Sequence, residues 1–565
     1  MALRLRVVAP LALLLILSGT RMGAAGWTRT ASAHFEIYTT GSATRAQDAL
    51  VYFEQVRDFF DRFLSLPQTS RLPTRVVLFS NAAEFEPYRI SPTATAYYQP
   101  GRERDYIVLS DFNGDSDPVI VHEYTHLALE RSGAAYPAWL SEGLAEFFST
   151  LAPARGKVLL GRAPIGRVAA LSQHAMLPLE RLLAVTHDSP EYLADHSGVF
   201  YAESWALTHM LIAGERYQPR VDRFLSLVAR GTPATDALTS VFDTTIAELE
   251  RELRRYVTRG FYRQLAVPGD LSTAARVSTS GGIETFDARL VLANLLAASR
   301  GRESQARAAF DALARERPSD APAAASRGLF EALTLHDDAA RTWLERALAA
   351  GTRDPIALGE LARIVEPTDA TRASELLETA FTLAPNDPLI RIRRASNLVT
   401  RRKGEAALAE ARRIDPVPTE FRFLYFQVIA NAHALLAHFD EAAAAATRVL
   451  EYAQTDAERR FARDLIQNVR APAGVTDMTH GRLSRMACDG PLPILEITTD
   501  AGLLRLAIDD PAKVVVPGGG AVDLDCGPQN RPLRIGYTRM TPPPGADGRV
   551  RFIDFAGIRR PERPA

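Results

Sequence analysis

The sequence predicts a multidomain protein with three parts of different fold class: an α+β domain, an all-α region of helical repeats and a small all-β domain. Three changes of pattern predict this order. Short alternating strands mix with helices over 27–265, alanine-rich helical periodicity fills 283–470, and apolar residues recur at every second position over 471–565. A chain of 565 residues is also too long for a single hydrophobic core, so several domains are expected.

Residues 1–25 have the pattern of a secretory signal peptide. Arg4 and Arg6 precede an apolar run from Val7 to Leu17, and small residues at 23–25 offer a cleavage site. A membrane anchor is the alternative, but this run is shorter than the roughly 20 residues that a spanning helix needs. We therefore expect a periplasmic or secreted protein with no stable membrane span after removal of the signal.

The charge balance bears on the kind of partner. The chain has 66 basic and 67 acidic side chains, for a net charge of -1, and it contains no basic block. Nucleic-acid binding is driven mainly by a surplus of lysine and arginine. The composition therefore argues against a nucleic-acid partner.

Within 27–265 the strands come early and the helices late, which favours an α+β fold over a regular βαβ array. Asp117 followed by Pro118 supplies an N-cap and a proline at the first helical position, so the helix that begins there is the best defined. Strands are predicted at His34–Thr39, Arg75–Phe79, Ala94–Tyr98 and Asp105–Ser110, and helices at Pro118–Arg131, Ala138–Ser149 and Val199–Ala213.

The helix at 118–131 carries a His-Glu-Tyr-Thr-His segment from His122 to His126. Four residues advance the chain just over one helical turn, so both imidazoles project from one face. Two neutral imidazoles suit Zn²⁺, and the intervening Glu123 then stands beside the open coordination position. The alternative is a helix whose histidines satisfy local hydrogen bonds and bind no metal.

A catalytic zinc ion held by two histidines needs a third protein ligand, and the next helix carries Trp139-Leu140-Ser141-Glu142-Gly143. Together the two motifs resemble the gluzincins, zinc metallopeptidases in which a downstream helix with a Trp-Leu-x-Glu-Gly pattern supplies a glutamate ligand. The chain is similar to bacterial peptidase-MA-like proteins that join this domain to helical repeats. The resemblance implies a thermolysin-like metallopeptidase domain over 27–265. No Gly-x-Met-x-Asn motif occurs upstream, so nothing supports aminopeptidase specificity.

The resemblance also implies a role for each residue of the site. One zinc ion is held by His122, His126 and Glu142, and Glu123 accepts a proton from the zinc-bound water. Glu146 lies one turn after Glu142, where a related branch of the family places an acidic residue that hydrogen-bonds a zinc histidine. We therefore expect Glu142, and not Glu146, to bind the metal.

Tyr201 is the candidate for stabilising the oxyanion, because gluzincins supply a tyrosine or histidine at about this point of the chain. His196 is the second candidate. Each residue has a plainer explanation, since a tyrosine at a helix start commonly packs its ring and ties its hydroxyl to backbone. The resemblance further implies that Asp105–Ser110 is an edge strand that pairs with extended peptide, and an ordinary internal strand is the alternative.

In 283–470, alanine-rich amphipathic helices end at Leu313–Pro318, Leu383–Pro385 and Ile414–Pro416. The first two of these ends are separated by close to two units of the tetratricopeptide period of about 34 residues. The region from Phe286 to Val469 therefore resembles tetratricopeptide repeats (TPR), with a plain helical bundle as the alternative. Such repeats offer a surface for a protein partner.

The last part, 471–565, contains both cysteines of the chain, Cys488 and Cys526. In an oxidising compartment these residues form one disulfide or remain two buried free thiols, and the sequence alone leaves both open. The predicted strands of this small all-β domain are Ile494–Thr498, Leu503–Ile508, Val514–Val516, Val522–Leu524, Leu533–Tyr537 and Val550–Phe555.

From these patterns we expect an exported zinc metallopeptidase that hydrolyses peptide bonds, with peptides or proteins as substrates. A different class of function remains open. The catalytic domain could be an inactive relic in a scaffold or assembly factor whose repeats bind protein partners. Metal content and turnover separate these hypotheses.

Overall fold

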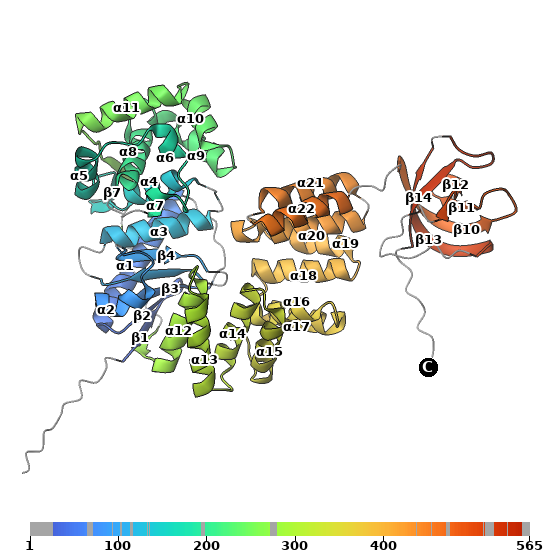
Figure 1. The fold of residues 1–565 in the computed structure, drawn as a ribbon, viewed down its shortest axis with the longest axis horizontal. Helices are drawn as coiled ribbons and strands as arrows, with labels where there is room; N and C mark the ends of the chain where they lie inside the picture. The colour runs from blue at the N-terminus through green and yellow to red at the C-terminus, as the bar shows by residue number, and fades with distance from the viewer. Residues whose placement is uncertain are drawn as a thin grey trace, which may run out of the picture. The chain divides into compact units, whose positions relative to one another are not determined.

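The computed structural model describes residues 26–555 except 65–71, 93, 102–103, 113–116, 133, 135, 194–197, 270, 272–278, 437, 454, 470–474, 512–513, 515–524 and 540. The predicted signal peptide at 1–25 lies outside these residues. Contacts divide the chain into two compact units, Met1–Phe330 and Glu331–Ala565, and each is described by itself (Figure 1). Among the described residues, no helix combines the length and the hydrophobicity that crossing a lipid bilayer requires.

The first unit is built on a six-stranded sheet in the order β4-β5-β3-β2-β1-β9. Strands β2, β3 and β5 run parallel, whereas β4 is antiparallel to β5, and β1 is antiparallel to both β2 and β9. The parallel strands are buried on both faces, as their apolar sequences require. The strand bounds are β1 Thr28–Ala31, β2 Phe35–Thr39, β3 Thr74–Leu78, β4 Ala96–Gln99, β5 Tyr106–Leu109 and β9 Thr279–Gly282.

The edge-strand prediction for Asp105–Ser110 is wrong. This segment is β5, which pairs with β3 on one side and β4 on the other. The edge strand is β4, because the chain returns antiparallel from β4 into β5 before β5 joins the parallel strands. Short apolar strands of similar composition do not reveal which of them lies at the edge.

Helices cover both faces of this sheet. Phe35, Ile37 and Val76 face the long helix α1 (Ala43–Leu64), and alternate residues such as Tyr38 and Val77 face the other side. A separate small sheet has the order β6-β7-β8. The remaining elements up to residue 268 are α2 Ala82–Phe85, η1 Glu86–Tyr88, α3 Asp117–Arg131, α4 Ala138–Phe148, β6 Ala152–Ala154, β7 Lys157–Leu160, α5 Ile165–Gln173, α6 Leu179–Leu183, α7 Pro190–Leu193, α8 Val199–Ala213, η2 Gln218–Arg220, α9 Val221–Ala229, α10 Ala234–Phe242, α11 Ile246–Arg259 and β8 Leu265–Pro268.

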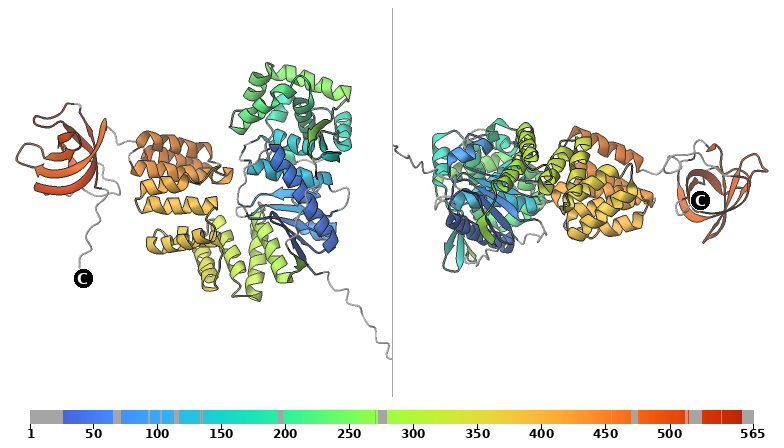
Figure 2. Two further views of the ribbon diagram at one scale, coloured as in Figure 1. Left: turned by 180° about the vertical axis from the view of Figure 1, so that it is seen from behind. Right: turned by 90° about the horizontal axis from the view of Figure 1, so that it is seen from below.

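The first helix after the sheet, α12 (Thr285–Ala298), packs on the second sheet face. Val291, Leu292 and Leu295 belong to the same apolar cluster as the strand residues of that face. In Figure 2, α12 is the yellow-green helix beside the sheet. In addition, the Gln99 side chain at the end of β4 donates a 2.9 Å hydrogen bond to the Ala298 carbonyl. The compact unit therefore extends to residue 330, past the boundary near 283 that the composition predicts.

Successive helix pairs confirm the predicted helical repeats. Buried alanines such as Ala373, Ala380 and Ala407 let neighbouring helices approach closely. Asp354 and Asp387 cap α16 and α18 ahead of a proline at the first helical position. The helices are α12, α13 Glu303–Glu316, α14 Ala321–Leu333, α15 Asp337–Ala349, α16 Pro355–Val365, α17 Ala370–Leu383, α18 Pro388–Thr400, α19 Gly404–Ala411, η3 Thr419–Phe421, α20 Arg422–Leu435, α21 Phe439–Glu451 and α22 Asp456–Asn468.

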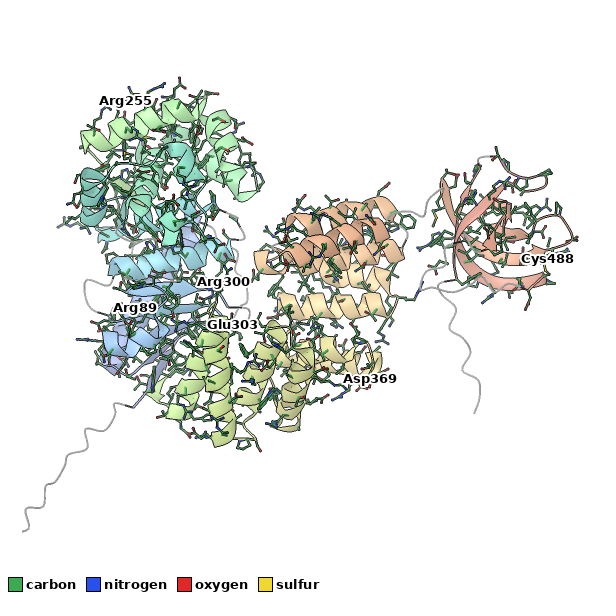
Figure 3. The ribbon with its side chains drawn as sticks, viewed as in Figure 1. Arg89, Arg255, Arg300, Glu303, Asp369 and Cys488 are labelled. Carbon is green, nitrogen blue, oxygen red and sulfur yellow. A yellow bond between two sulfur atoms is a disulfide. The ribbon has the colours of Figure 1, made fainter. Side chains whose placement is uncertain are left out.

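The C-terminal part is a closed barrel in the order β10-β11-β12-β14-β13 around a small apolar core. A disulfide joins Cys488 and Cys526, whose Cα atoms are 5.9 Å apart, so the free-thiol alternative is wrong (Figure 3). Most of the predicted strands at Val514–Val516 and Val522–Leu524 lies outside the described residues. The strands are β10 Asp477–Ala487, β11 Ile494–Thr499, β12 Gly502–Ala507, β13 Gly527–Thr538 and β14 Gly548–Asp554.

Candidate metal centre

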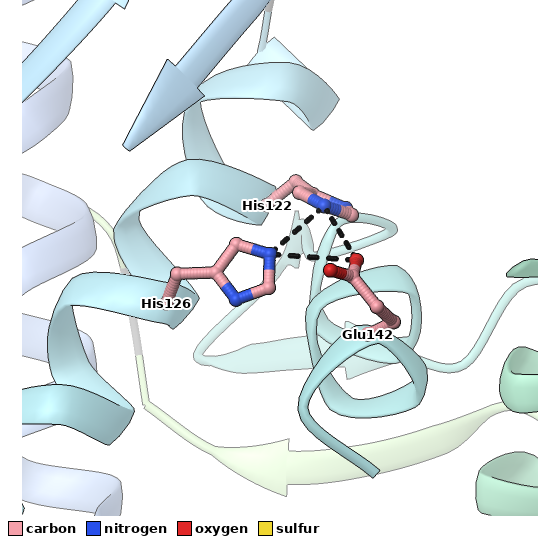
Figure 4. A group of neighbouring side chains, drawn as sticks. All are labelled: His122, His126 and Glu142. Carbon is pink, nitrogen blue, oxygen red and sulfur yellow. Dashed lines mark hydrogen bonds and ion pairs between the residues drawn. The ribbon is translucent and has the colours of Figure 1, made fainter. Parts of the chain in front are cut away.

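Helices α3 and α4 bring three side chains together in the first unit. Helix α3 lies between the edge strand β4 and α4, and it presents His122 and His126 one turn apart. Helix α4 presents Glu142 toward both imidazoles (Figure 4). This group is the one set of three or more potential metal ligands found among the described residues.

The three ligand atoms form a nearly equilateral triangle. The two Nε2 atoms of His122 and His126 are 3.2 Å apart. Glu142 Oε2 lies 3.4 Å from His122 Nε2 and 3.5 Å from His126 Nε2. A tetrahedral zinc site with bonds of about 2.0–2.1 Å has ligand atoms about 3.3–3.4 Å apart. The triangle therefore has the size of one face of a zinc tetrahedron.

The carboxylate of Glu142 is the second observation that fits a cation. Glu142 is 3% exposed, and its buried Oε2 atom accepts no hydrogen bond from the described residues. An ionised oxygen removed from water and left without a hydrogen bond costs several kcal/mol unless a cation compensates it. The donor set of two imidazole nitrogens and one carboxylate oxygen is the set that zinc accepts.

A close helix contact explains why glycine follows Glu142. A Cβ atom at Gly143 would lie 2.4 Å from the Ser204 carbonyl oxygen and 2.0 Å from Thr208 Oγ1. Helix α8 can therefore cross α4 closely only if residue 143 has no side chain. Trp139, one turn before Gly143 on the same face of α4, is fully buried in the same core. The Trp-Leu-x-Glu-Gly pattern thus serves the packing that aims Glu142 at α3.

Each histidine has a polar partner on its other ring nitrogen. Glu146 Oε1 lies 3.4 Å from His122 Nδ1, and Ser141 Oγ lies 3.2 Å from His126 Nδ1. Glu146 is itself held by Arg167 of α5, at 2.6 Å. Such partners orient a ligating imidazole and select which nitrogen faces the metal. Glu146 thus lies beside His122, whereas Ser141 is the unspecified position of the Trp-Leu-x-Glu-Gly pattern and no motif includes Arg167.

Glu123 lies beside the edge strand. It is 9% exposed, and its Oε2 accepts a 2.7 Å hydrogen bond from the Tyr98 backbone N–H of β4. This N–H is directed to Glu123 of α3, so it lies on the edge of β4 that faces away from β5. The carboxylate that is expected to take a proton therefore adjoins the one strand edge of the sheet that borders α3.

The two tyrosines near the site have different contacts. The Tyr192 hydroxyl donates a 2.9 Å hydrogen bond to Glu142 Oε1. The Tyr201 side chain is 1% exposed, and its hydroxyl contacts the Tyr192 carbonyl oxygen at 3.4 Å. The structure thus brings Tyr192, which the sequence did not single out, onto a ligand. Tyr201 therefore packs its ring and contacts backbone with its hydroxyl, which is the alternative to an oxyanion role. His196 lies outside the described residues.

The charges of the site reinforce one another. Burial by itself would lower the pKa of the His122 imidazole, but Glu142, Glu146 and Glu123 outweigh burial and raise this pKa to about 9. Burial likewise opposes ionisation of Glu142, yet the two imidazoles prevail and hold its pKa well below the ordinary value. The centre is therefore an anionic environment that favours positive charge between its three ligand atoms.

Comparison with known proteins finds similarity only to solved structures. No protein-family model matches the chain, and no curated protein matches it. One similar structure is YrrB, described as a TPR protein with an unusual peptide-binding site, with 18% identity and a TM-score of 0.25 over 32% of this chain and 98% of that one. A second is TTC0263, a thermophilic TPR protein of Thermus thermophilus, with 18% identity and a TM-score of 0.27 over 32% and 100%. A third is pilF of Pseudomonas aeruginosa, with 17% identity and a TM-score of 0.26 over 33% and 88%. At these values the likeness carries no argument about function.

Proposed function

We propose that the first unit is a zinc-dependent hydrolase of peptide bonds with a thermolysin-like catalytic domain. The observation that carries this proposal is the triangle of His122, His126 and Glu142, whose buried Oε2 atom accepts no hydrogen bond from the described residues. Glu123 stands next to this triangle in the sequence and at the outer edge of β4 in space. A metal site alone would be structural, but a metal site with an adjacent carboxylate is equipped for hydrolysis.

His122, His126 and Glu142 would hold one zinc ion, which when bound supplies a water of lowered pKa and polarises the scissile carbonyl. Glu123 would take a proton from that water on its carboxylate and later deliver it to the leaving amine. Tyr98 N–H keeps Glu123 at the edge of the sheet, where an extended peptide can pair with β4. Export to the periplasm or out of the cell belongs to the same proposal and rests on the pattern of residues 1–25.

The helical repeats support a second function, the binding of protein partners. Repeats of this type present extended surfaces that suit a protein partner, and two of the similar structures named above are described as TPR proteins. In the alternative form of the proposal the metal centre is inactive and the chain is a scaffold or assembly factor.

One experiment separates the two functions. The protein lacking residues 1–25 is purified, its zinc content is measured, and it is incubated with a peptide library with and without a chelator. The hydrolase predicts about one zinc per chain and cleavage that the chelator abolishes. A protein that binds zinc but cleaves no peptide would support the scaffold alternative. A protein that binds no zinc after reconstitution would contradict the metal centre itself.

A further inference from the structure

We infer that Tyr192 is a positioning residue for the third metal ligand, and that Tyr201 supports Tyr192 from one step further away. This inference rests on the proposed zinc site and deepens it, because it names what determines which carboxylate oxygen faces the metal. The juxtaposition joins two regions far apart in the chain, since Tyr192 and Glu142 are separated by 50 residues.

The two oxygens of Glu142 have different surroundings. Oε1 accepts the Tyr192 hydroxyl at 2.9 Å. Oε2 faces the Nε2 atoms of both histidines at 3.4 and 3.5 Å and accepts no hydrogen bond from the described residues. A hydrogen bond to one carboxylate oxygen makes that oxygen a weaker ligand, so the other oxygen is the favoured one for a cation. Tyr192 therefore favours binding through a single oxygen, as a four-coordinate site with an open position requires.

The chemistry of a phenol suits this task. At neutral pH an ordinary tyrosine hydroxyl is protonated and donates, whereas an ionised carboxylate only accepts, so the direction of the bond is fixed. The last side-chain torsion of glutamate has a broad range of allowed values. The hydrogen bond from Tyr192 restricts this torsion and so fixes the orientation of the carboxylate plane. Without the hydroxyl, Glu142 is free to rotate or to offer both oxygens, and the preorganisation of the triangle is lost.

Tyr192 is in turn held in place by Tyr201 and its neighbours. The Tyr201 hydroxyl contacts the Tyr192 carbonyl oxygen at 3.4 Å, and the ring centroids of the two tyrosines are 6.0 Å apart. The guanidinium of Arg167 lies 5.3 Å from the centre of the Tyr201 ring. Because Arg167 also binds Glu146, the same guanidinium adjoins the residues behind His122 and those behind Glu142. Tyr201 thus lies one step further from the metal than Tyr192.

Zinc affinity of hydroxyl-deletion variants tests the inference without any substrate. Dissociation constants are measured by competition with a chelator for the parent, Tyr192→Phe and Tyr201→Phe. Tyr256→Phe is the matched control, because it removes another part-buried hydroxyl, which lies 2.7 Å from His209 Nδ1. Loss of a residue that orients a metal ligand typically weakens binding about 10–100-fold. We expect a loss of that size for Tyr192→Phe, a smaller loss for Tyr201→Phe and none for Tyr256→Phe.

Two further readouts distinguish positioning from a loss of structure. The melting temperatures of the metal-free variants report folding, and the visible absorption of the cobalt-substituted forms reports the number of ligands. Tyr192→Phe is expected to alter the cobalt spectrum toward a higher coordination number, whereas Tyr256→Phe keeps the parent spectrum. A Tyr192→Phe protein with parental affinity and spectrum would overturn the inference, as would a larger effect of Tyr201→Phe.

The outcomes also separate this inference from the proposed hydrolase. If the parent protein binds zinc but cleaves no peptide, the proposed hydrolase function is contradicted. The role of Tyr192 is then still tested by the zinc affinities of the variants. Parental affinity of Tyr192→Phe ends the inference and leaves the hydrolase intact. A parent protein that binds no zinc contradicts both.

Discussion

The two units of the protein treat buried carboxylates in opposite ways. In the repeats, Glu360 is 1% exposed and is paired with the guanidiniums of Arg363 and Arg393. In the candidate metal centre, Glu142 is 3% exposed, but its neighbours are two imidazoles and one tyrosine hydroxyl. Both acids lie on helices within a packed core, so burial alone does not distinguish them.

The difference lies in the cationic partner. A guanidinium keeps its proton at every physiological pH, so the pairs of Glu360 are permanent and serve packing between α16 and α18. An imidazole can release its proton, and its freed nitrogen then binds metal. The imidazoles beside Glu142 can therefore lose a proton and bind a divalent cation together with it. The guanidiniums beside Glu360 stay charged and themselves supply the positive charge. The chemistry of the partner separates a site from a structural ion pair.

The largest expected effect concerns Glu123, a buried carboxylate that accepts a hydrogen bond from the Tyr98 N–H and that we expect to bind no metal. Glu123→Gln keeps the shape of the side chain but removes its capacity to accept a proton. We expect peptide hydrolysis to fall about 10²–10⁴-fold, because proton transfer typically contributes that much. Zinc content, measured by elemental analysis, should stay at the parental level. Parental turnover in this variant would rule out the proposed mechanism.

A matched pair of substitutions compares the two carboxylates directly. Glu142→Gln replaces an anionic ligand by a neutral amide and should weaken zinc binding by more than about 100-fold. Glu360→Gln should leave zinc affinity unchanged and instead destabilise the protein by about 3–5 kcal/mol, because it removes the charge of the buried carboxylate that pairs with Arg393. Chelator competition and denaturant unfolding measure the two effects.

The contrast fails if the two variants behave alike. Loss of zinc in Glu360→Gln would mean that stability of the repeats supports the metal centre. Full zinc affinity in Glu142→Gln would show that the third ligand is another group, and Glu146 would be the next to vary.

How far the sequence predicts the molecule also differs between regions. Helix α8 matches its predicted bounds of Val199–Ala213, because glycines flank both ends of an apolar segment. Strand β10 was missed, since its residues Asp477–Ala487 do not alternate regularly in polarity. Gly481, in the middle of β10, looks like a break, yet a Cβ there would lie 2.6 Å from the Thr498 carbonyl oxygen of β11. Such a close approach between paired strands has no signature in a single sequence.

In the candidate site, too, some residues are predictable from the sequence and others are not. His122, Glu123, His126 and Glu142 are predictable because helical periodicity fixes their relative directions within short segments. Tyr192 and Arg167 reach the centre from elements 50 and 21 residues away from the acids they contact. No periodicity links such positions, so only the tertiary structure brings them together.

The pH dependence of zinc binding tests the difference between the titratable imidazoles beside Glu142 and the permanently charged guanidiniums beside Glu360. In the zinc-free protein the pKa of His122 is raised to about 9, so below pH 9 a proton occupies a ligand nitrogen. Zinc must displace that proton, and we expect affinity to rise about tenfold per pH unit between pH 7 and 9 and then to level. Titration calorimetry in two buffers at pH 7.5 should detect release of about one proton. If zinc affinity instead stops rising near pH 6.5, the neighbouring glutamates do not raise the pKa of His122.

The same titration affects the stability of the zinc-free protein, with a sign that follows from the direction of the shift. The folded-state pKa of His122 lies above the ordinary value of about 6.5, so the folded state binds the proton more tightly than the unfolded state. The stabilisation from His122 is therefore complete below pH 6.5 and is lost as pH rises through 9. Saturating zinc should abolish this dependence, because the metal takes the place of the proton.

The smallest expected effect belongs to an ion pair at the surface. Arg300 follows α12 and lies 3.4 Å from Asp188, four residues before Tyr192, but the two side chains are 91% and 82% exposed. Solvent screens such a pair, and ordering two long side chains offsets the attraction. Arg300→Ala should therefore leave the melting temperature and zinc affinity unchanged within error. Leu295→Ala on the same helix is the contrasting variant, because it removes fully buried contacts with the sheet and should lower stability by about 2–5 kcal/mol. A drop in zinc affinity for Arg300→Ala would instead mean that the first repeat helix controls the segment that carries Tyr192 through this single exposed contact.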